Sequence, residues 1–132
     1  MEIDTCADVS KSMGITYIEG TVTGAKGKHA TVNFLVDSGA KYTLLPAKAW
    51  KRIGLKPERT MTFVLADGTP VQRDISECRI SLPHGKTHTP VVLGKPKDEP
   101  LLGVVTLEEL GLVFNPFERT LQPARMLLAR MR

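Results

Sequence analysis

Short runs in which apolar and polar residues alternate dominate this chain. Residues 30–36 are the clearest case, because Val32, Phe34 and Val36 recur with the period of two that a half-buried β-strand shows. Similar runs, bounded by glycine or proline, predict further strands at residues 17–23, 61–65, 69–75, 79–82, 89–93, 112–114 and 120–122. Asp67-Gly68 separates two of these runs and is typical of a two-residue hairpin turn.

Two segments have a helical pattern instead. In residues 46–53, Pro46 suits the first turn of a helix and Gly54 ends it. Thr106-Leu107-Glu108-Glu109 has the form of a capping box, and Gly111 ends the short helix that it opens. Many short strands with two short helices predict an all-β fold, a compact barrel of mainly antiparallel strands.

The length of the chain allows one domain. At 132 residues and 14.5 kDa, a single core buries enough surface to fold without disulfides or structural metal. We expect the domain to span residues 14–123. Residues 1–13 are polar and without a period, which predicts a flexible arm. Residues 124–132 form a basic and apolar tail, which we interpret as a contact for another copy, since exposed apolar ends promote association.

Several features favour a cytoplasmic protein. No apolar run approaches the roughly 20 residues that a membrane-spanning helix needs, so we expect no membrane partner. The segment Met1-Glu2-Ile3-Asp4 is acidic and lacks the apolar core of a secretory signal. Cys6 and Cys78 lack the spacing of metal ligands and are interpreted as free thiols in a reducing compartment. Cys78, in a predicted strand, is expected to be a small buried hydrophobe.

The net charge of +4 comes from the tail rather than from the body. The chain has 18 basic and 14 acidic residues, but three of the arginines lie in the last nine residues, which hold no acid. Without these three, 15 basic residues face 14 acidic ones. A nucleic-acid-binding barrel would need a basic and aromatic strand face. Aromatic residues are only 5% of the chain, so we expect no nucleic-acid partner.

Asp37-Ser38-Gly39 is the sharpest chemical signal in the sequence. A carboxylate directly after an apolar strand can hold a water molecule, a small hydroxyl residue can brace the loop, and glycine lets two backbones approach closely. The tripeptide is also an ordinary turn sequence, because Asp, Ser and Gly all favour turns. Its meaning therefore depends on the residues around it.

These surroundings resemble the retropepsins, the retroviral-type (clan AA) aspartic proteases, and above all their small stand-alone bacterial members. Val32-Asn33-Phe34-Leu35-Val36 before the tripeptide and Ala40-Lys41-Tyr42-Thr43-Leu44-Leu45-Pro46 after it look like the active-site segment. Residues 101–111 resemble the second motif of the family, a pair of apolar residues and a glycine that open a short helix. The Asp67-Gly68 hairpin lies where the family places its flap. The resemblance runs from residue 15 to residue 123.

The resemblance implies a closed retropepsin-like barrel and an aspartic endopeptidase. Hydrolysis by this route needs two facing carboxylates that share one proton, and the chain has a single Asp-Ser/Thr-Gly sequence. The implied enzyme is therefore a homodimer that cleaves a peptide or protein substrate, with Asp37 supplied by each chain and with no metal or organic cofactor. The implied site residues are Asp37 as the catalytic group, Ser38, Gly39 and Ala40 as the active-site loop, Leu65, Ala66, Asp67, Gly68 and Thr69 as the flap over the substrate, and Leu101, Leu102 and Gly103 as the second motif.

The sequence departs from the family pattern at two places. Lys41 stands where the family usually has an acid, and Val104 stands where it has an arginine. The family pairs these two charges to brace the dimer, so another contact must brace it here. The flap tip, Ala66-Asp67-Gly68-Thr69, replaces a glycine-rich one. A more polar and less mobile flap would narrow the substrate range, or it would accompany lost proteolysis.

Other interpretations remain open at this point. The same fold would also suit a catalytically weak or inactive dimeric module that holds an extended peptide beneath the flap by strand addition. Asp37 would then be a structural residue. His84 and His88 are four residues apart, but the glycine between them favours a surface loop over a zinc site. Trp50 is interpreted as core or interface packing.

Overall fold

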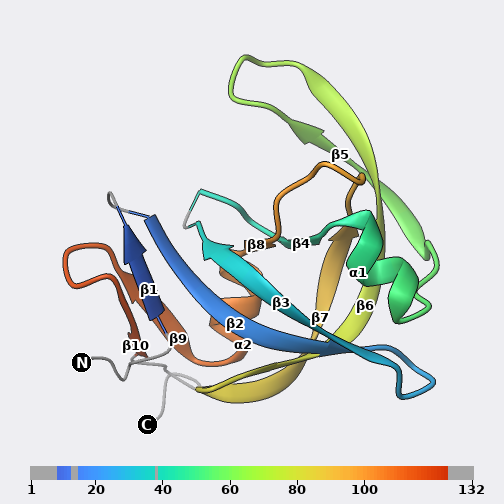
Figure 1. The fold of residues 1–132 in the computed structure, drawn as a ribbon. Helices are drawn as coiled ribbons and strands as arrows, with labels where there is room; N and C mark the ends of the chain where they lie inside the picture. Colours follow the sequence, from blue (N-terminus) through green and yellow to red (C-terminus); the bar gives the residue numbers. More distant parts are fainter. Residues whose placement is uncertain (1–8, 13–14, 38, 125–132) are drawn as a thin grey trace, which may run out of the picture.

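The computed structural model describes residues 9–12, 15–37 and 39–124. Its elements follow the chain in the order β1 (Val9–Ser12), β2 (Ile15–Thr23), β3 (His29–Val36), β4 (Thr43–Leu45), α1 (Ala47–Arg52), β5 (Arg59–Val64), β6 (Pro70–Leu82), β7 (Gly85–Leu93), β8 (Leu101–Leu102), α2 (Val104–Glu109), β9 (Leu112–Asn115) and β10 (Thr120–Pro123) (Figure 1). The predicted all-β fold with two short helices is confirmed for the described residues.

One sheet contains most of the strands. Its hydrogen-bonded order is β1-β2-β3-β8-β4-β7-β6-β5, and β2 pairs with β6 as well. Because of this additional pairing, neighbouring strands lead from β2 through β3, β8, β4, β7 and β6 back to β2. Most pairings are antiparallel, whereas β3–β8 and β4–β7 are parallel. β9 and β10 form a separate hairpin.

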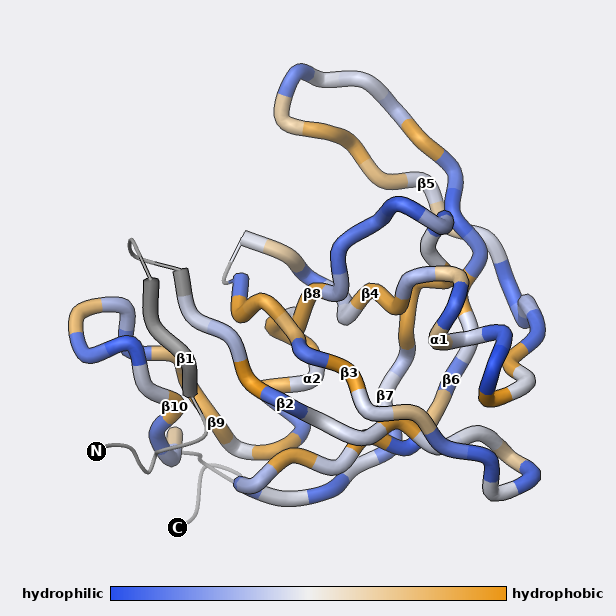
Figure 2. Tube along the Cα trace, in the orientation of Figure 1, coloured by the Kyte–Doolittle hydropathy of each residue, from blue (hydrophilic) through white to orange (hydrophobic). Residues whose placement is uncertain are grey.

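The core lies inside this circuit of strands. The alternation in β3 holds in the structure, since Val32, Phe34 and Val36 are buried. Phe34 packs with Ile18 and Leu102, and none of the three has exposed surface. Burying a side chain of this size contributes about 1.5–3 kcal/mol relative to leaving it in water. In Figure 2 the hydrophobic colour accordingly recurs along the strands that bound this interior.

The first helix confirms its sequence signals. Pro46 is the N-cap of α1, and Gly54 follows the helix with a φ of 77°, which favours glycine. Trp50 is half-buried against the core, and its Nε1–H donates to the Gly94 carbonyl at 2.8 Å. The interpretation of Trp50 as core packing is therefore confirmed.

The separate strands predicted at residues 69–75 and 79–82 are wrong, because both belong to the single strand β6. Ile75 and Ser76 are neighbours in sequence and both are buried, which interrupts the alternation. At this point the pairing with β5 on one side of β6, along residues 70–75, ends, and the pairing with β7 on the other side, along residues 75–82, begins. Each half is regular by itself, so the sequence pattern suggests two strands.

The predicted capping box is also wrong. The α2 helix begins at Val104, its N-cap is Gly103, and no side chain caps it. Thr106 has no exposed surface, and its hydroxyl lies 2.6 Å from the Thr43 hydroxyl and 2.8 Å from that of Thr89. Tertiary hydrogen bonds have therefore taken the group that the local pattern assigned to the helix end.

Three short strands are missing from the sequence-based prediction. β4 and β8 have only three and two residues, too few for a period to be visible. β1 lies in the segment predicted as an irregular arm, and that prediction is wrong for residues 9–12, which pair with β2. Residues 1–8 of the arm, with Cys6, and residues 125–132 of the tail lie outside the described residues. Within the described part of the chain, no helix has the length and apolar character needed to span a membrane.

Candidate active site

Asp37 lies directly after β3, where a segment distant in sequence lies alongside. Leu35 and Val36 at the end of β3 pair in parallel with Leu101 and Leu102 of β8. The Asp37 N–H donates to the Leu102 carbonyl at 3.4 Å. The structure thus places the candidate catalytic residue beside the second motif.

The loop that follows bends back onto Asp37. The Ala40 N–H donates to the Asp37 carbonyl at 3.0 Å, and the Gly39 N–H donates to the Asp37 Oδ1 at 2.8 Å. The second bond orients the carboxylate. A Cβ atom at Gly39 would lie 3.2 Å from that oxygen, so glycine lets the N–H approach without crowding. Ser38 lies outside the described residues.

The N-terminal end of α2 holds the same loop. The first N–H groups of a helix have no partner within the helix. Here the Val104 N–H donates to the Ala40 carbonyl and the Val105 N–H to the Lys41 carbonyl, each at 2.9 Å. Lys41 and Val104 cannot form the ion pair that the family has at these positions. The same two segments are instead joined by these two main-chain hydrogen bonds.

Gly103 permits this contact between the loop and the helix. A Cβ atom at Gly103 would lie 2.3 Å from the Tyr42 carbonyl carbon and 2.7 Å from the Lys41 carbonyl oxygen. Both are backbone atoms, which cannot move aside like the end of a side chain. The glycine of the second motif is therefore required by close packing against the active-site loop.

Three buried threonines join the elements beneath the site. The Gly103 N–H donates to the Thr43 Oγ1 at 3.0 Å, and Thr43, Thr106 and Thr89 then follow in a row. Each hydroxyl has one proton. Its oxygen can accept two further bonds, so either member of the Thr43–Thr106 pair and of the Thr106–Thr89 pair can be the donor. This network connects β4, α2 and β7, and the sequence analysis missed it because threonine is common in strands.

The predicted flap is the β5–β6 hairpin, which projects from the body of the molecule (Figure 1). The two-residue turn predicted there is wrong, because Leu65 and Thr69 are still joined by the Leu65 N–H to Thr69 carbonyl bond at 2.8 Å. A three-residue loop, Ala66-Asp67-Gly68, connects them. Gly68 has a φ of 89°, which is typical of the glycine that ends such a loop. Figure 2 shows the hydrophilic tip between more hydrophobic arms.

The Asp67 side chain stabilises this tip. Its Oδ1 accepts the Thr69 N–H at 2.9 Å, and hydrogen bonds from Thr69 lower the pKa of the Asp67 carboxyl. The apolar side chains beside the tip remain open to solvent, with Val64 70% and Leu65 49% exposed.

An aromatic contact connects the flap to the active-site segment. The rings of Phe63 in β5 and Tyr42 meet edge to face, with centroids 5.9 Å apart and an interplanar angle of 79°. Aromatic pairs of this geometry contribute about 0.5–1.5 kcal/mol beyond the area that they bury. The contact joins the flap to the segment that follows Asp37. The sequence analysis missed it because the two rings are far apart in the chain.

Other candidate groups do not take part in a site of this kind. Cys78 in β6 is buried, and burial raises the pKa of its thiol to about 12, so it is no nucleophile at neutral pH. The interpretation of Cys78 as a buried hydrophobe is confirmed. Among the described residues, no group of three or more His, Cys, Asp or Glu side chains is placed to hold a metal ion.

Comparison with known proteins agrees with this geometry. The family model described as "gag-polyprotein putative aspartyl protease" matches residues 18–109. The chain belongs to this retroviral-type aspartyl protease family. The solution structure of the Simian Foamy Virus (mac) protease is similar in fold, with a TM-score of 0.51 and 22% sequence identity, over 71% of this chain and 93% of the viral one. No curated protein matches the sequence.

Membership of the family confirms the resemblance to the retroviral-type aspartic proteases. The matched range contains both Asp37 and Gly103, the residues that the structure brings together through β3 and β8. A retropepsin-like protease fold is thus established.

Proposed function

We propose that this aspartyl protease family member is an active endopeptidase that works as a homodimer. In this mechanism the Asp37 carboxylates of two chains face each other across a two-fold axis and share one proton, because two like charges about 3 Å apart cannot both ionise. The ionised carboxylate takes a proton from a water molecule. The protonated one polarises the carbonyl group of the scissile peptide bond.

The proposal rests on the Asp37 carboxylate, which a hydrogen bond orients and which is the one Asp-Ser/Thr-Gly carboxylate of the chain. Asp37 is held by the Gly39 N–H at 2.8 Å and lies on a loop tied to α2. Such a loop costs little reorganisation during the reaction. Since the chain has only one Asp-Ser/Thr-Gly sequence, the second carboxylate must come from another copy. In the proposed dimer, Ser38 locks the two loops together and residues 65–70 close over the substrate.

The test is cleavage of a diverse peptide library between about pH 4 and pH 7 by the wild type and by Asp37→Asn, both at high protein concentration. We expect cleavage by the wild type and none above background by the variant. Unfolding and sedimentation measurements on both proteins verify that the variant still folds and associates. Equal background from two folded, dimeric proteins would overturn the proposed activity.

A second candidate is favoured by the exposed apolar residues of the flap. Val64 and Leu65 are open to solvent, as expected of a hairpin that packs on an extended peptide whether or not the peptide is cut. A dimeric binding module would hold such a peptide without hydrolysis. Binding of library peptides by both wild type and Asp37→Asn, with no products from either, would favour this function.

We also propose a cytoplasmic location. The thiol of Cys78 is free as well as buried, which agrees with a protein that does not depend on an oxidising compartment. Cell fractionation tests this location. We expect the protein in the cytosolic fraction, and recovery from a membrane or secreted fraction would contradict the proposal.

A further inference from the structure

The outer half of β3 is an open edge of the sheet. On one side β3 pairs with β2 from His29 to Leu35. On the other side β8 pairs only with Leu35 and Val36, because β8 has two residues. In the described part of the chain, residues 29–34 therefore have a strand neighbour on one side alone.

Two hydrogen bonds show which main-chain groups face that open side. The Leu35 N–H donates to the Pro100 carbonyl at 3.0 Å, away from β2. Alternate residues of a strand direct their main-chain groups to the same side, so Asn33, Thr31 and His29 face the open edge as well. The His29 carbonyl confirms this, since it accepts the Arg52 Nε–H of α1 at 3.3 Å. The N–H and C=O groups of Thr31 and Asn33 remain at the edge.

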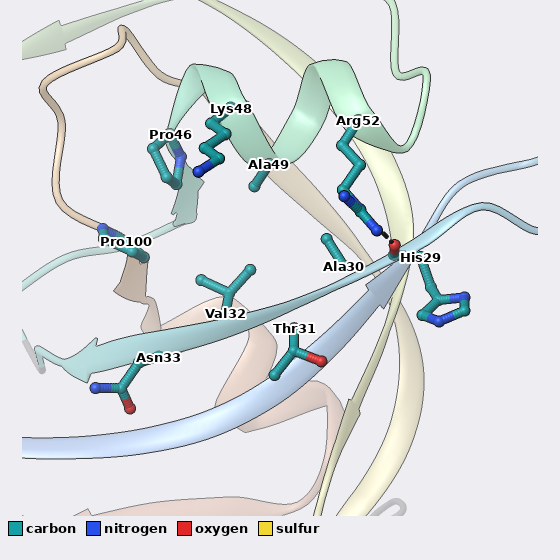
Figure 3. A pocket seen from close by; sticks show the side chains of 10 residues that line it. All are labelled: His29, Ala30, Thr31, Val32, Asn33, Pro46, Lys48, Ala49, Arg52 and Pro100. Carbon is teal, nitrogen blue, oxygen red and sulfur yellow. Dashed lines mark hydrogen bonds between the residues drawn. The ribbon is translucent and has the colours of Figure 1, made fainter.

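A hollow of about 570 Å³ lies between this edge and α1. Figure 3 shows Ala30 and Val32 directed toward the helix, while the side chains of Thr31 and Asn33 point away from it. Thr31 and Asn33 therefore border the hollow with their main chain. Unpaired strand edges of this kind can accept a further strand.

The hollow is positively charged. Lys48 and Arg52 of α1 line it, and Figure 3 shows both side chains extending from the helix toward β3. An adjoining hollow of about 400 Å³ shares Arg52 and adds Lys26 and Lys28. Among the described residues that line either hollow, none is acidic. Arg52 has five N–H donors and uses one of them on His29, so it can bind a carboxylate as well.

From these observations we propose that the β3 edge is a docking site for an extended acidic peptide segment of a partner protein. The segment adds as a strand through the N–H and C=O groups of Thr31 and Asn33. Its Asp or Glu side chains on the α1 side meet Lys48 and Arg52. An extended peptide fits better than a small anion, because the unpaired groups alternate donor and acceptor along a strand.

The site is separate from Asp37, which follows the opposite end of β3. A partner protein would thus bind the β3 edge through one segment, while a different segment of it could lie beneath the flap. The inference does not depend on hydrolysis, and it can be tested in the Asp37→Asn protein, where the probe is not cut.

The test uses a fluorescent peptide of alternating Glu and Thr as the probe, with fluorescence anisotropy as the measurement. We expect Lys48→Glu/Arg52→Glu to weaken binding by at least about tenfold, a change of 1.4 kcal/mol. The matched control is Arg79→Glu/Lys86→Glu, which makes the same charge change at exposed residues of β6 and β7 and is expected to leave binding within about twofold. Equal weakening by both double variants would overturn the proposal, because it would show only attraction between net charges.

Two further probes test the strand addition. A peptide with Gln in place of Glu and a peptide with proline replacing alternate residues are both expected to bind at least about tenfold more weakly. Hydrogen exchange at the Thr31 and Asn33 amides, fast in the free protein, should slow when the acidic peptide binds. Binding that leaves these two amides unprotected, or that tolerates the prolines, would overturn the docking mode. Equal binding of a DNA duplex would overturn the choice of an acidic peptide.

Discussion

At the scale of single residues, Asp67 shows how one carboxylate fixes a turn. Hydrogen bonds from Thr69 favour its ionised form and lower its pKa below the ordinary value of 3.8. A lowered carboxyl pKa contributes stability above the unfolded pKa, and this contribution is lost as the pH falls through the folded value. The flap tip should therefore be ordered at neutral pH and loosen in acid, below about pH 3.8.

The first prediction concerns this pKa. In an NMR titration of the carboxyl carbons, we expect Asp67 to titrate below 3.8, and Thr69→Ala to move its pKa back toward that value. Thr62→Ala, a change at an exposed residue of β5 outside the tip, should leave it unaltered. An Asp67 pKa that does not respond to Thr69→Ala would show that another group sets it.

The second prediction concerns Gly103, which has a φ of −93° that any residue adopts. Its requirement for glycine comes from the contact with the main chain of Lys41 and Tyr42, where a Cβ atom would lie 2.3 Å from the Tyr42 carbonyl carbon. We expect Gly103→Ala to lower the free energy of unfolding by more than about 3 kcal/mol. Gly27→Ala is the comparison, since Gly27 has a φ of 83° and open space around it, and should cost only about 1–2 kcal/mol. Urea unfolding of both variants measures the difference, and equal losses would contradict the contact.

At the scale of elements, the threonine network decides how α2 sits against the sheet. Local sequence assigns Thr106 to a helix cap, but in the structure its hydroxyl joins Thr43 of β4 to Thr89 of β7. A buried hydroxyl without a partner costs more than a lost surface bond. The position of α2, and with it the loop of Asp37, therefore depends on this network.

The third prediction is that Thr106→Val lowers the free energy of unfolding by about 1–3 kcal/mol, although valine has nearly the same shape. Hydrogen exchange at the Gly103 amide should quicken, because its acceptor Thr43 loses its own partner. The matched control is Thr62→Val on the exposed side of β5, which should change stability by less than about 0.5 kcal/mol. If the two variants are equally stable, the network does not hold α2.

At the scale of the whole molecule, the proposed enzyme is incomplete as one chain. Its single Asp37 would require a second copy, so activity should depend on association. Two main-chain hydrogen bonds from α2 hold the loop of Asp37 within each chain. In the proposed dimer, other surfaces must therefore supply the contacts between the two chains.

The fourth prediction follows from this dependence. Specific activity should fall on dilution, at the concentration where sedimentation shows the dimer dissociating. Adding an equal amount of Asp37→Asn chains should reduce the activity per wild-type chain to about half, because half of the wild-type chains then pair with the variant. Activity that is unchanged by dilution and by mixing would contradict a site shared between two chains.

The sequence by itself determined the features that depend on neighbouring residues. The alternation around Phe34 predicted β3, and Pro46 and Gly54 predicted α1. The resemblance of the two motifs around Asp37 and Gly103 to a known family implied the retropepsin-like fold. These signals are local because burial period, turn conformation and helix ends each involve only a few consecutive residues.

Only the tertiary structure decided which distant groups meet. It made one strand of β6 by giving each half its own partner, and it moved Thr106 from a helix cap into a buried network. It also left Thr31 and Asn33 at an open edge, because β8 is too short to cover β3. Such outcomes depend on hydrogen-bond partners far away in the chain, and no pattern of consecutive residues specifies them.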